Sequence, residues 1–157
     1  MRLDWQKLFP EGYSAFRDLQ DVINSGTLDP RLKELVKIRA SQINRCAYCL
    51  DMHTKDALAI GESEQRINLL PAWREAPFYS SPERAALAWC EALTELPVSD
   101  PSDQIYEELE RLFNQKEIVE LTLTIVAINS WNRFGVGFRS EAGRYVSHKK
   151  PVLESLH

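Results

Sequence analysis

The feature that most restricts the fold of this chain is a series of helix-start and helix-stop signals with no convincing strand pair between them. The clearest case is the segment 28–44, in which Asp29 is a natural N-cap and Pro30 suits the first helical position. Elsewhere, Gly61 and Pro97 are typical of residues at which a helix stops. The sequence therefore predicts an all-α fold, with helices at 13–25, 28–44, 47–60, 64–70, 80–96, 102–113 and 115–131.

The last predicted helix, 115–131, is apolar almost all round in its middle, which indicates a buried helix. The glycines of the following segment, 133–144, predict a turn or irregular structure. Residues 34–49 and 120–135 also align weakly with each other, with asparagine and glycine in the second segment where the first has its cysteines. If this similarity is a true repeat, a helix pair was duplicated and only the first copy kept its thiols.

Length, composition and charge narrow the class of protein. A chain of 157 residues suits a single domain, 1–157, and its 44% apolar and 27% charged residues are ordinary for a globular protein. A net charge of −4 argues against a nucleic-acid partner, because phosphate binding needs a concentrated basic face. No apolar run approaches the roughly 20 residues of a membrane span, and the N-terminus lacks a signal-peptide stretch. We therefore expect a cytoplasmic protein without a membrane partner.

The densest chemistry lies in the stretch RCAYCLDMH, residues 45–53. If Cys46 lies in the first helical turn, Cys49 is about 60° from it around the helix and His53 about 20°. The three side chains then share one stripe, and Cys49 and His53 are i,i+4 neighbours. A helix N-terminus favours a thiolate. The spacing thus predicts an activated nucleophile with a base in reach and a second thiol to resolve the product.

Glu34 is a candidate fourth member, because it borders the apolar face of the preceding helix and a partly buried carboxylate beside a histidine can relay protons. A zinc half-site is an alternative, but a structural zinc needs four ligands and the other histidines, His148 and His157, lie near the C-terminal end. A third interpretation is a group of buried residues without a function. Cys90 has no such neighbours in the sequence and is predicted to be a core residue.

The pattern E-x11-C-x2-C-x3-H-x7-G, from Glu34 to Gly61, resembles the core motif of the alkylhydroperoxidase AhpD family, within the carboxymuconolactone decarboxylase-like superfamily. The resemblance covers residues 29–61 directly. It implies an AhpD-like multi-helix orthogonal bundle that assembles as a homo-oligomer, a trimer or a hexamer. It also implies a dithiol peroxidase or disulfide reductase, whose partners are a small hydroperoxide and a thiol electron donor such as a dihydrolipoyl group.

The same resemblance assigns roles to residues. Cys46 and Cys49 would cycle between dithiol and disulfide, Glu34 and His53 would carry the proton relay, and neither a metal nor another cofactor is needed. Tyr48 stands where the best-known members have a second histidine. Because a phenol has a pKa near 10, Tyr48 is predicted to form a hydrogen bond or line the substrate pocket instead of relaying protons.

Three residues of the last helical region, Asn129, Asn132 and Arg133, could approach the dithiol through the weak repeat, and Asn132 is a candidate for the substrate pocket. We favour a simpler interpretation of these three as capping residues near a helix end.

Three functional hypotheses follow. The first is an antioxidant peroxidase in which Cys49 attacks the peroxide and Cys46 resolves the sulfenic acid, with the opposite assignment left open. The second is a protein disulfide reductase or redox adaptor that serves a peroxiredoxin and does not reduce peroxide itself. The third is a non-enzymatic helical domain with a sensor thiol pair or a metal.

Overall fold

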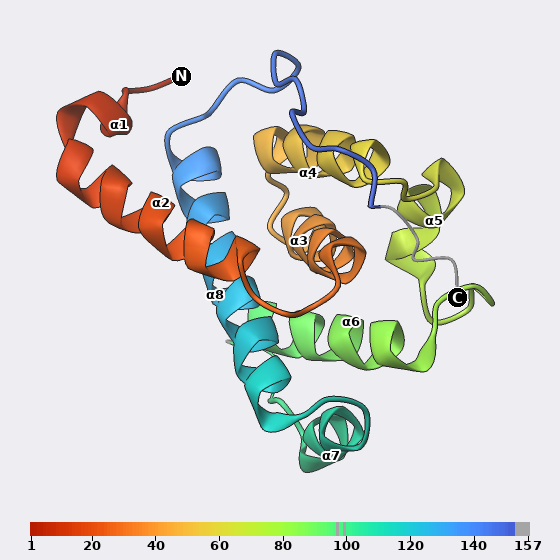
Figure 1. The fold of residues 1–157 in the computed structure, drawn as a ribbon. Helices are drawn as coiled ribbons and strands as arrows, with labels where there is room; N and C mark the ends of the chain where they lie inside the picture. The colour runs from red at the N-terminus through yellow and green to blue at the C-terminus, as the bar shows by residue number, and fades with distance from the viewer. Residues whose placement is uncertain (97, 99, 153–157) are drawn as a thin grey trace.

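The structure is a computed structural model that describes residues 1–96, 98 and 100–152. Over these residues it contains eight α-helices, one short 3-10 helix and no strand, so the predicted all-α fold is confirmed. Figure 1 shows α3 near the centre, viewed almost along its axis, with the other helices arranged around it. The elements are α1 (Trp5–Leu8), α2 (Pro10–Asn24), α3 (Pro30–Ile43), α4 (Ala47–Ala59), α5 (Glu64–Leu69), η1 (Leu70–Ala72), α6 (Ser81–Thr94), α7 (Asp103–Leu112) and α8 (Gln115–Gly137).

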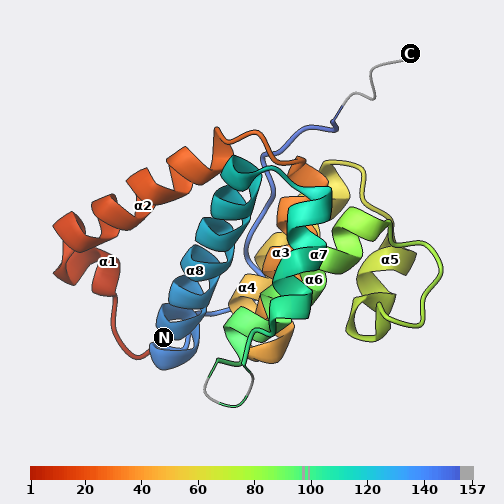
Figure 2. The same cartoon turned by 90° about the horizontal axis from the view of Figure 1, so that it is seen from below.

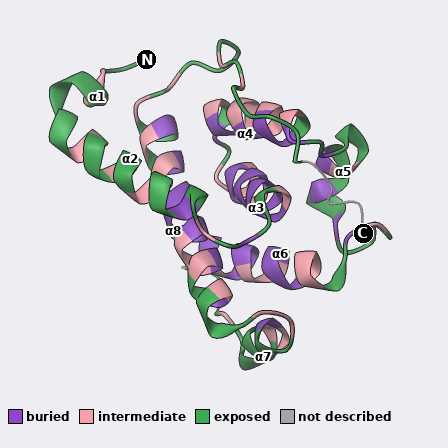
Figure 3. Ribbon diagram, in the orientation of Figure 1, coloured by how far each residue is buried: buried purple, intermediate pink, exposed green. Residues whose placement is uncertain are grey.

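Helix α3 is the core of the molecule, because it packs against α4, α6 and α8 at once. Figure 3 shows it as the most completely buried helix of this view. Val36 and Ala40 face the apolar cluster shared with α8, whereas Leu35 and Ile38 face a second cluster shared with α5. A helix enclosed on several sides also carries some of its polar residues into the interior, and Glu34 is one of them.

The predicted helix starts are largely those of the structure. Asp29 caps α3 through its side chain and Pro30 occupies the first turn, as predicted. Helix α6 starts with a capping box in which the Ser80 side chain and Glu83 satisfy each other's backbone N–H groups. The predicted stop of this helix at Pro97 lies outside the described residues.

The end of α8 differs from the prediction. The helix continues to Gly137, so the predicted turn begins about one turn of helix too early, and the irregular segment starts after Phe138. Gly135 lies inside the helix and faces the disulfide. A Cβ added at this position would lie 2.7 Å from the Cys46 sulfur. Glycine at this position reflects close packing and not a chain reversal.

The weak internal repeat does not correspond to a duplicated helix pair. Residues 34–49 span the end of α3, a turn and the start of α4, whereas residues 120–135 lie within the single helix α8. The sequence similarity therefore reflects shared helical patterning and not a shared pair of elements.

The N-terminal helices contact α8 through aromatic side chains, and Figure 2 shows α2 beside α8, with the C-terminal end of α2 near the start of α8. Helix α1 was not predicted, and α2 starts at Pro10 and not at Tyr13. Aromatic rings hold this contact together: Trp5 stacks on Phe134 with 4.0 Å between ring centroids, and Phe16 packs edge-on against Trp131. Among the residues that the structure describes, no helix has both the length and the apolar character that a membrane span requires.

Candidate active site

Cys46 and Cys49 are joined by a disulfide at the start of α4. Cys46 is the N-cap and not a helical residue, and its sulfur accepts the backbone N–H of Cys49 at 3.3 Å. Arg45 just before it has a left-handed backbone, with φ of 57°, which makes the sharp connection from α3. Both cysteines are almost fully buried, at 1% and 2% exposed, so the pair lies beneath the surface at a helix N-terminus.

Glu34 and His53 form a buried carboxylate–imidazole pair between α3 and α4. The Oε2 atom of Glu34 lies 2.8 Å from Nδ1 of His53, and the residues are 2% and 6% exposed. His53 is on the same helix as Cys49, four residues further on. The structure therefore places all four residues of the sequence motif around the start of α4 and the neighbouring face of α3.

Two lysines that the sequence analysis missed also contact Glu34. Its Oε1 atom accepts from Nζ of Lys37 at 3.1 Å and from Nζ of Lys149 at 2.6 Å. Burial alone would raise the pKa of the Glu34 carboxyl, but His53, Lys37 and Lys149 outweigh this and hold that pKa well below its usual range. Lys37 could have been inferred as an i+3 neighbour of Glu34. Lys149 could not, because nothing local connects it to α3.

Asp56, one turn after His53, extends this buried polar group. Together Glu34, His53 and Asp56 offer ligand atoms within 4.8 Å of one another, which is the spacing of a metal site. The carboxylate oxygens, however, already accept from the ammonium groups of Lys37 and Lys149 and from two hydroxyl groups. This arrangement favours a proton relay over a cation site. The alternative zinc site would need thiolates, whereas in this structure the two cysteine sulfurs are bonded to each other.

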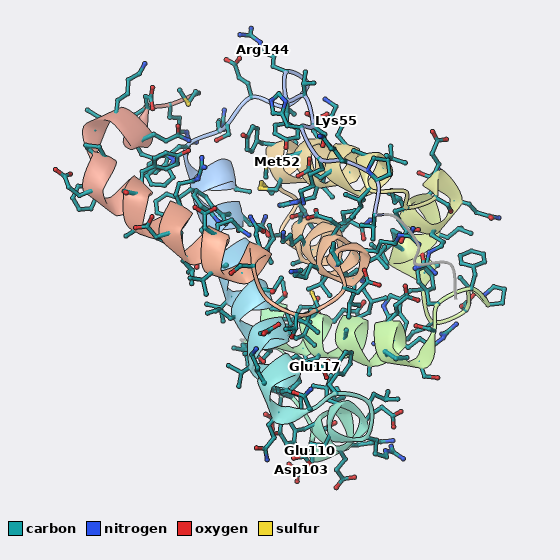
Figure 4. All side chains as sticks on the ribbon, in the orientation of Figure 1. Met52, Lys55, Asp103, Glu110, Glu117 and Arg144 are labelled. Carbon is teal, nitrogen blue, oxygen red and sulfur yellow. A yellow bond between two sulfur atoms is a disulfide. The ribbon has the colours of Figure 1, made fainter. Side chains whose placement is uncertain are left out.

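A cavity of about 360 Å³ opens beside His53. Tyr48 and Met52 from α4 line this cavity. Figure 4 shows Met52 on the side of α4 that faces α2. The cavity wall combines polar and charged side chains with four aromatic residues: Tyr13, Tyr48, Trp131 and Tyr145. Of the motif residues, His53 lines this cavity, and Cys49 lies one helical turn before it on α4.

Tyr48 lies on the wall of this cavity. Burial, together with neighbouring Tyr13 and Asp51, raises the pKa of its phenol. The hydroxyl therefore stays protonated near neutral pH, which suits a hydrogen-bond donor better than a base.

Asn132 does not lie on the cavity, and its prediction as a capping residue is wrong because α8 continues past it to Gly137. The side chain is 1% exposed, donates to the Ser41 hydroxyl at 3.0 Å, and accepts from the Asn44 amide at 2.9 Å. Asn129 accepts from the same amide at 2.9 Å. These asparagines therefore fix α8 to the end of α3, just before the cysteines.

Arg133 is not a cap either, since it bonds back to Asn129 within α8. Cys90 is fully buried, as predicted for a core residue, and its sulfur faces the Val36 carbonyl oxygen. Burial raises the pKa of its thiol to about 12, so it stays a neutral thiol.

A helical bundle with a buried cysteine pair at a helix start and a carboxylate–histidine pair beside it defines the class of AhpD-like proteins. The comparisons agree. The carboxymuconolactone decarboxylase family matches residues 10–92, and the chain belongs to this family. YdfG, an uncharacterized protein of Bacillus subtilis, is 39% identical over 141 residues, which cover 90% of this chain and 96% of YdfG.

Solved structures show the same fold. A protein of unknown function from Agrobacterium tumefaciens, provisionally described as the antioxidant defence protein AhpD, superposes with a TM-score of 0.88 at 43% identity. The match covers 92% of this chain and 99% of that one. The debrominase Bmp8, solved with 2,3,4-tribromopyrrole, has a TM-score of 0.80 at 21% identity over 88% of this chain and 74% of its own, a likeness of fold alone.

Proposed function

We propose that this protein is a cysteine-dependent peroxidase of the AhpD type, which reduces a hydroperoxide with the Cys46–Cys49 dithiol. The observation that carries the proposal is the buried Glu34–His53 pair, one helical turn from Cys49. A carboxylate bonded to one imidazole nitrogen orients the ring and leaves the other nitrogen to exchange a proton with a thiol. The 43% identical structure with a provisional antioxidant description supports the same class.

The proposed cycle balances without another cofactor. Cys49 gives its proton to His53, and the thiolate attacks the terminal peroxide oxygen, which breaks the O–O bond. The leaving alkoxide takes a proton from His53 and departs as an alcohol, and Cys49 becomes a sulfenic acid. The Cys46 thiol then attacks that sulfur, so that a disulfide forms and water leaves. An external dithiol, such as a dihydrolipoyl group, returns the pair to thiols by two exchange steps.

Single serine variants of the two cysteines, in a Cys90→Ser background, test this cycle. With Cys46→Ser, hydroperoxide should produce a sulfenic acid at Cys49 that dimedone traps, and Cys49→Ser should trap none. The reverse pattern would make Cys46 the attacking residue, which its N-cap position also favours. If neither variant is trapped and the unmodified protein consumes no peroxide, the peroxidase proposal is wrong. Turnover of a disulfide substrate under those conditions would select the disulfide reductase alternative.

The aromatic residues of the cavity wall favour an organic hydroperoxide over hydrogen peroxide. We expect a higher kcat/KM for cumene hydroperoxide than for hydrogen peroxide. Equal kcat/KM values for the two substrates would show that the aromatic residues do not select an organic hydroperoxide.

Assembly and location belong to the same proposal. Val119 and Val126 are 66% and 51% exposed and lie seven residues apart on α8, so they present apolar surface on one side of that helix. We propose that copies of the chain associate as a trimer or hexamer, which light scattering on the purified protein tests. The cycle also needs a compartment that keeps donor thiols reduced, for which the cytoplasm is suited.

A further inference from the structure

The chain after α8 crosses the outer side of α4 and passes beside the Glu34–His53 pair. We call this segment, residues 143–152, the C-terminal strap. Figure 1 shows it in dark blue over α4. Its backbone is attached along its length: Gly143 N–H donates to Asp51, the Tyr145 carbonyl oxygen accepts from Lys55, and Val152 N–H donates to the Ile60 carbonyl oxygen. Figure 4 shows Lys55 on the side of α4 that the strap covers.

Asp56 is the buried point at which the strap is fixed. Its carboxylate is 5% exposed and accepts from the Tyr145 hydroxyl at 2.8 Å and from the Ser147 hydroxyl at 2.6 Å. The Lys149 ammonium lies 3.5 Å from the second oxygen of the same carboxylate. Three side chains of the strap therefore contact one aspartate. These contacts hold the backbone around Lys149 in place and so determine which groups its ammonium can contact.

Lys149 reaches the relay itself. Its Nζ atom lies 2.6 Å from Oε1 of Glu34, whose other oxygen lies 2.8 Å from Nδ1 of His53. One carboxylate thus connects the lysine of the strap to the imidazole of α4. The Lys149 side chain is 35% exposed, so it forms the outer end of a group whose inner members are buried.

Charged groups of both signs lie around His53, and Lys33 of α3 adds a further positive charge near Glu34. Glu34 and Asp56 carry two negative charges, and Lys37 and Lys149 carry two positive charges. Removing Lys149 would take one positive charge away from the surroundings of a buried imidazole, and this change favours the protonated ring. The other charged or titratable groups around the cavity are Tyr13, Arg17 and Asp21 from α2, Tyr48 from α4 and Tyr145 from the strap.

We propose that Lys149 is a positioning residue, which holds the Glu34 carboxylate toward His53 and places a positive charge where it disfavours protonation of the imidazole. The C-terminal strap is thus part of the relay, although Lys149 is 115 residues from Glu34 in sequence. The consequence for thiol chemistry rests on the peroxidase function proposed above. The effect of Lys149 on His53 does not rest on that function, because it depends only on the contacts of Lys149 and His53 with Glu34.

The test compares three full-length variants: Lys149→Met, Lys149→Arg as the conservative variant, and Lys150→Met as a matched control from the next, exposed position of the strap. The protonation of His53 is followed by NMR of the imidazole across pH, with circular dichroism to check that each variant is folded. The Lys149 ammonium is two hydrogen bonds from the imidazole, through Glu34. Its removal in Lys149→Met should raise the titration midpoint of His53 by about one pH unit. Arginine should restore most of the shift, and Lys150→Met should cause none.

An unchanged His53 midpoint in Lys149→Met, or an equal shift in Lys150→Met, would overturn the proposal. A second measurement separates it from the peroxidase function. If the protein consumes hydroperoxide, the acidic limb of its pH–rate profile should move upward with the His53 midpoint in Lys149→Met. If the unmodified protein consumes none, the peroxidase function fails, and the NMR titration still decides the role of Lys149.

Discussion

Two glycines in the last turns of α8 provide a matched test of how closely that helix packs on the disulfide. A Cβ added at Gly135 would lie 2.7 Å from the Cys46 sulfur and 3.3 Å from the Cys49 sulfur. A Cβ added at Gly137 would meet no atom within 4 Å. Neither glycine has a positive φ, so alanine fits the backbone at both positions.

The two alanine substitutions share one energy term and differ in the other. Alanine is favoured over glycine in a helix by up to about 1 kcal/mol, and somewhat less at the terminal Gly137. At Gly135 the new methyl group overlaps sulfurs that the disulfide prevents from rotating away, and overpacking of this kind costs about 1–3 kcal/mol. Gly137→Ala should therefore be slightly stabilising, and Gly135→Ala should be less stable than Gly137→Ala by about 1–3 kcal/mol.

Urea unfolding of the oxidised proteins measures this difference from the transition midpoints, provided that the m-values agree. Repeating the comparison in a Cys46→Ser, Cys49→Ser background is the control, because two unlinked hydroxyl groups are smaller than the disulfide and free to rotate. The difference between the alanine variants should shrink there. Equal midpoints for the two variants in the oxidised protein would refute the close approach of α8 to the sulfurs.

Two further predictions concern buried titratable groups. Glu34→Gln leaves Lys37 without its carboxylate partner and should lower the unfolding free energy by about 3–5 kcal/mol at pH 7. Because the folded-state pKa of Glu34 is depressed, this contribution is present above the ordinary value of 4.5 and is lost as the pH falls below it. Urea titrations of both proteins from pH 7 to acid should therefore converge, and a constant gap would contradict the assignment. Cys90, whose thiol has its pKa raised to about 12, should stay unlabelled by iodoacetamide in the native reduced protein at pH 8 and react only in urea, as mass spectrometry can show.

Local patterns in the sequence determined most of the helices. The caps at Asp29 and near Ser80 act within one turn, so their effect can be recognised from spacing alone. The order of the motif residues on α4 is equally local, because Cys49 and His53 share one helix and a fixed periodicity. The same reasoning failed at the end of α8, where glycine usually indicates a turn but here allows close contact with the disulfide.

Whether Glu34 meets His53 was a different kind of question, since it depends on how α3 packs against α4. The sequence motif suggested the pair through its family resemblance, and only the packed structure gives the 2.8 Å contact between them. Lys149 lies beyond any such inference, because its contact joins residues 115 positions apart. Sequence spacing determines which side chains share a helix face. Their partners on other helices and on the strap are decided by tertiary packing, which no local periodicity encodes.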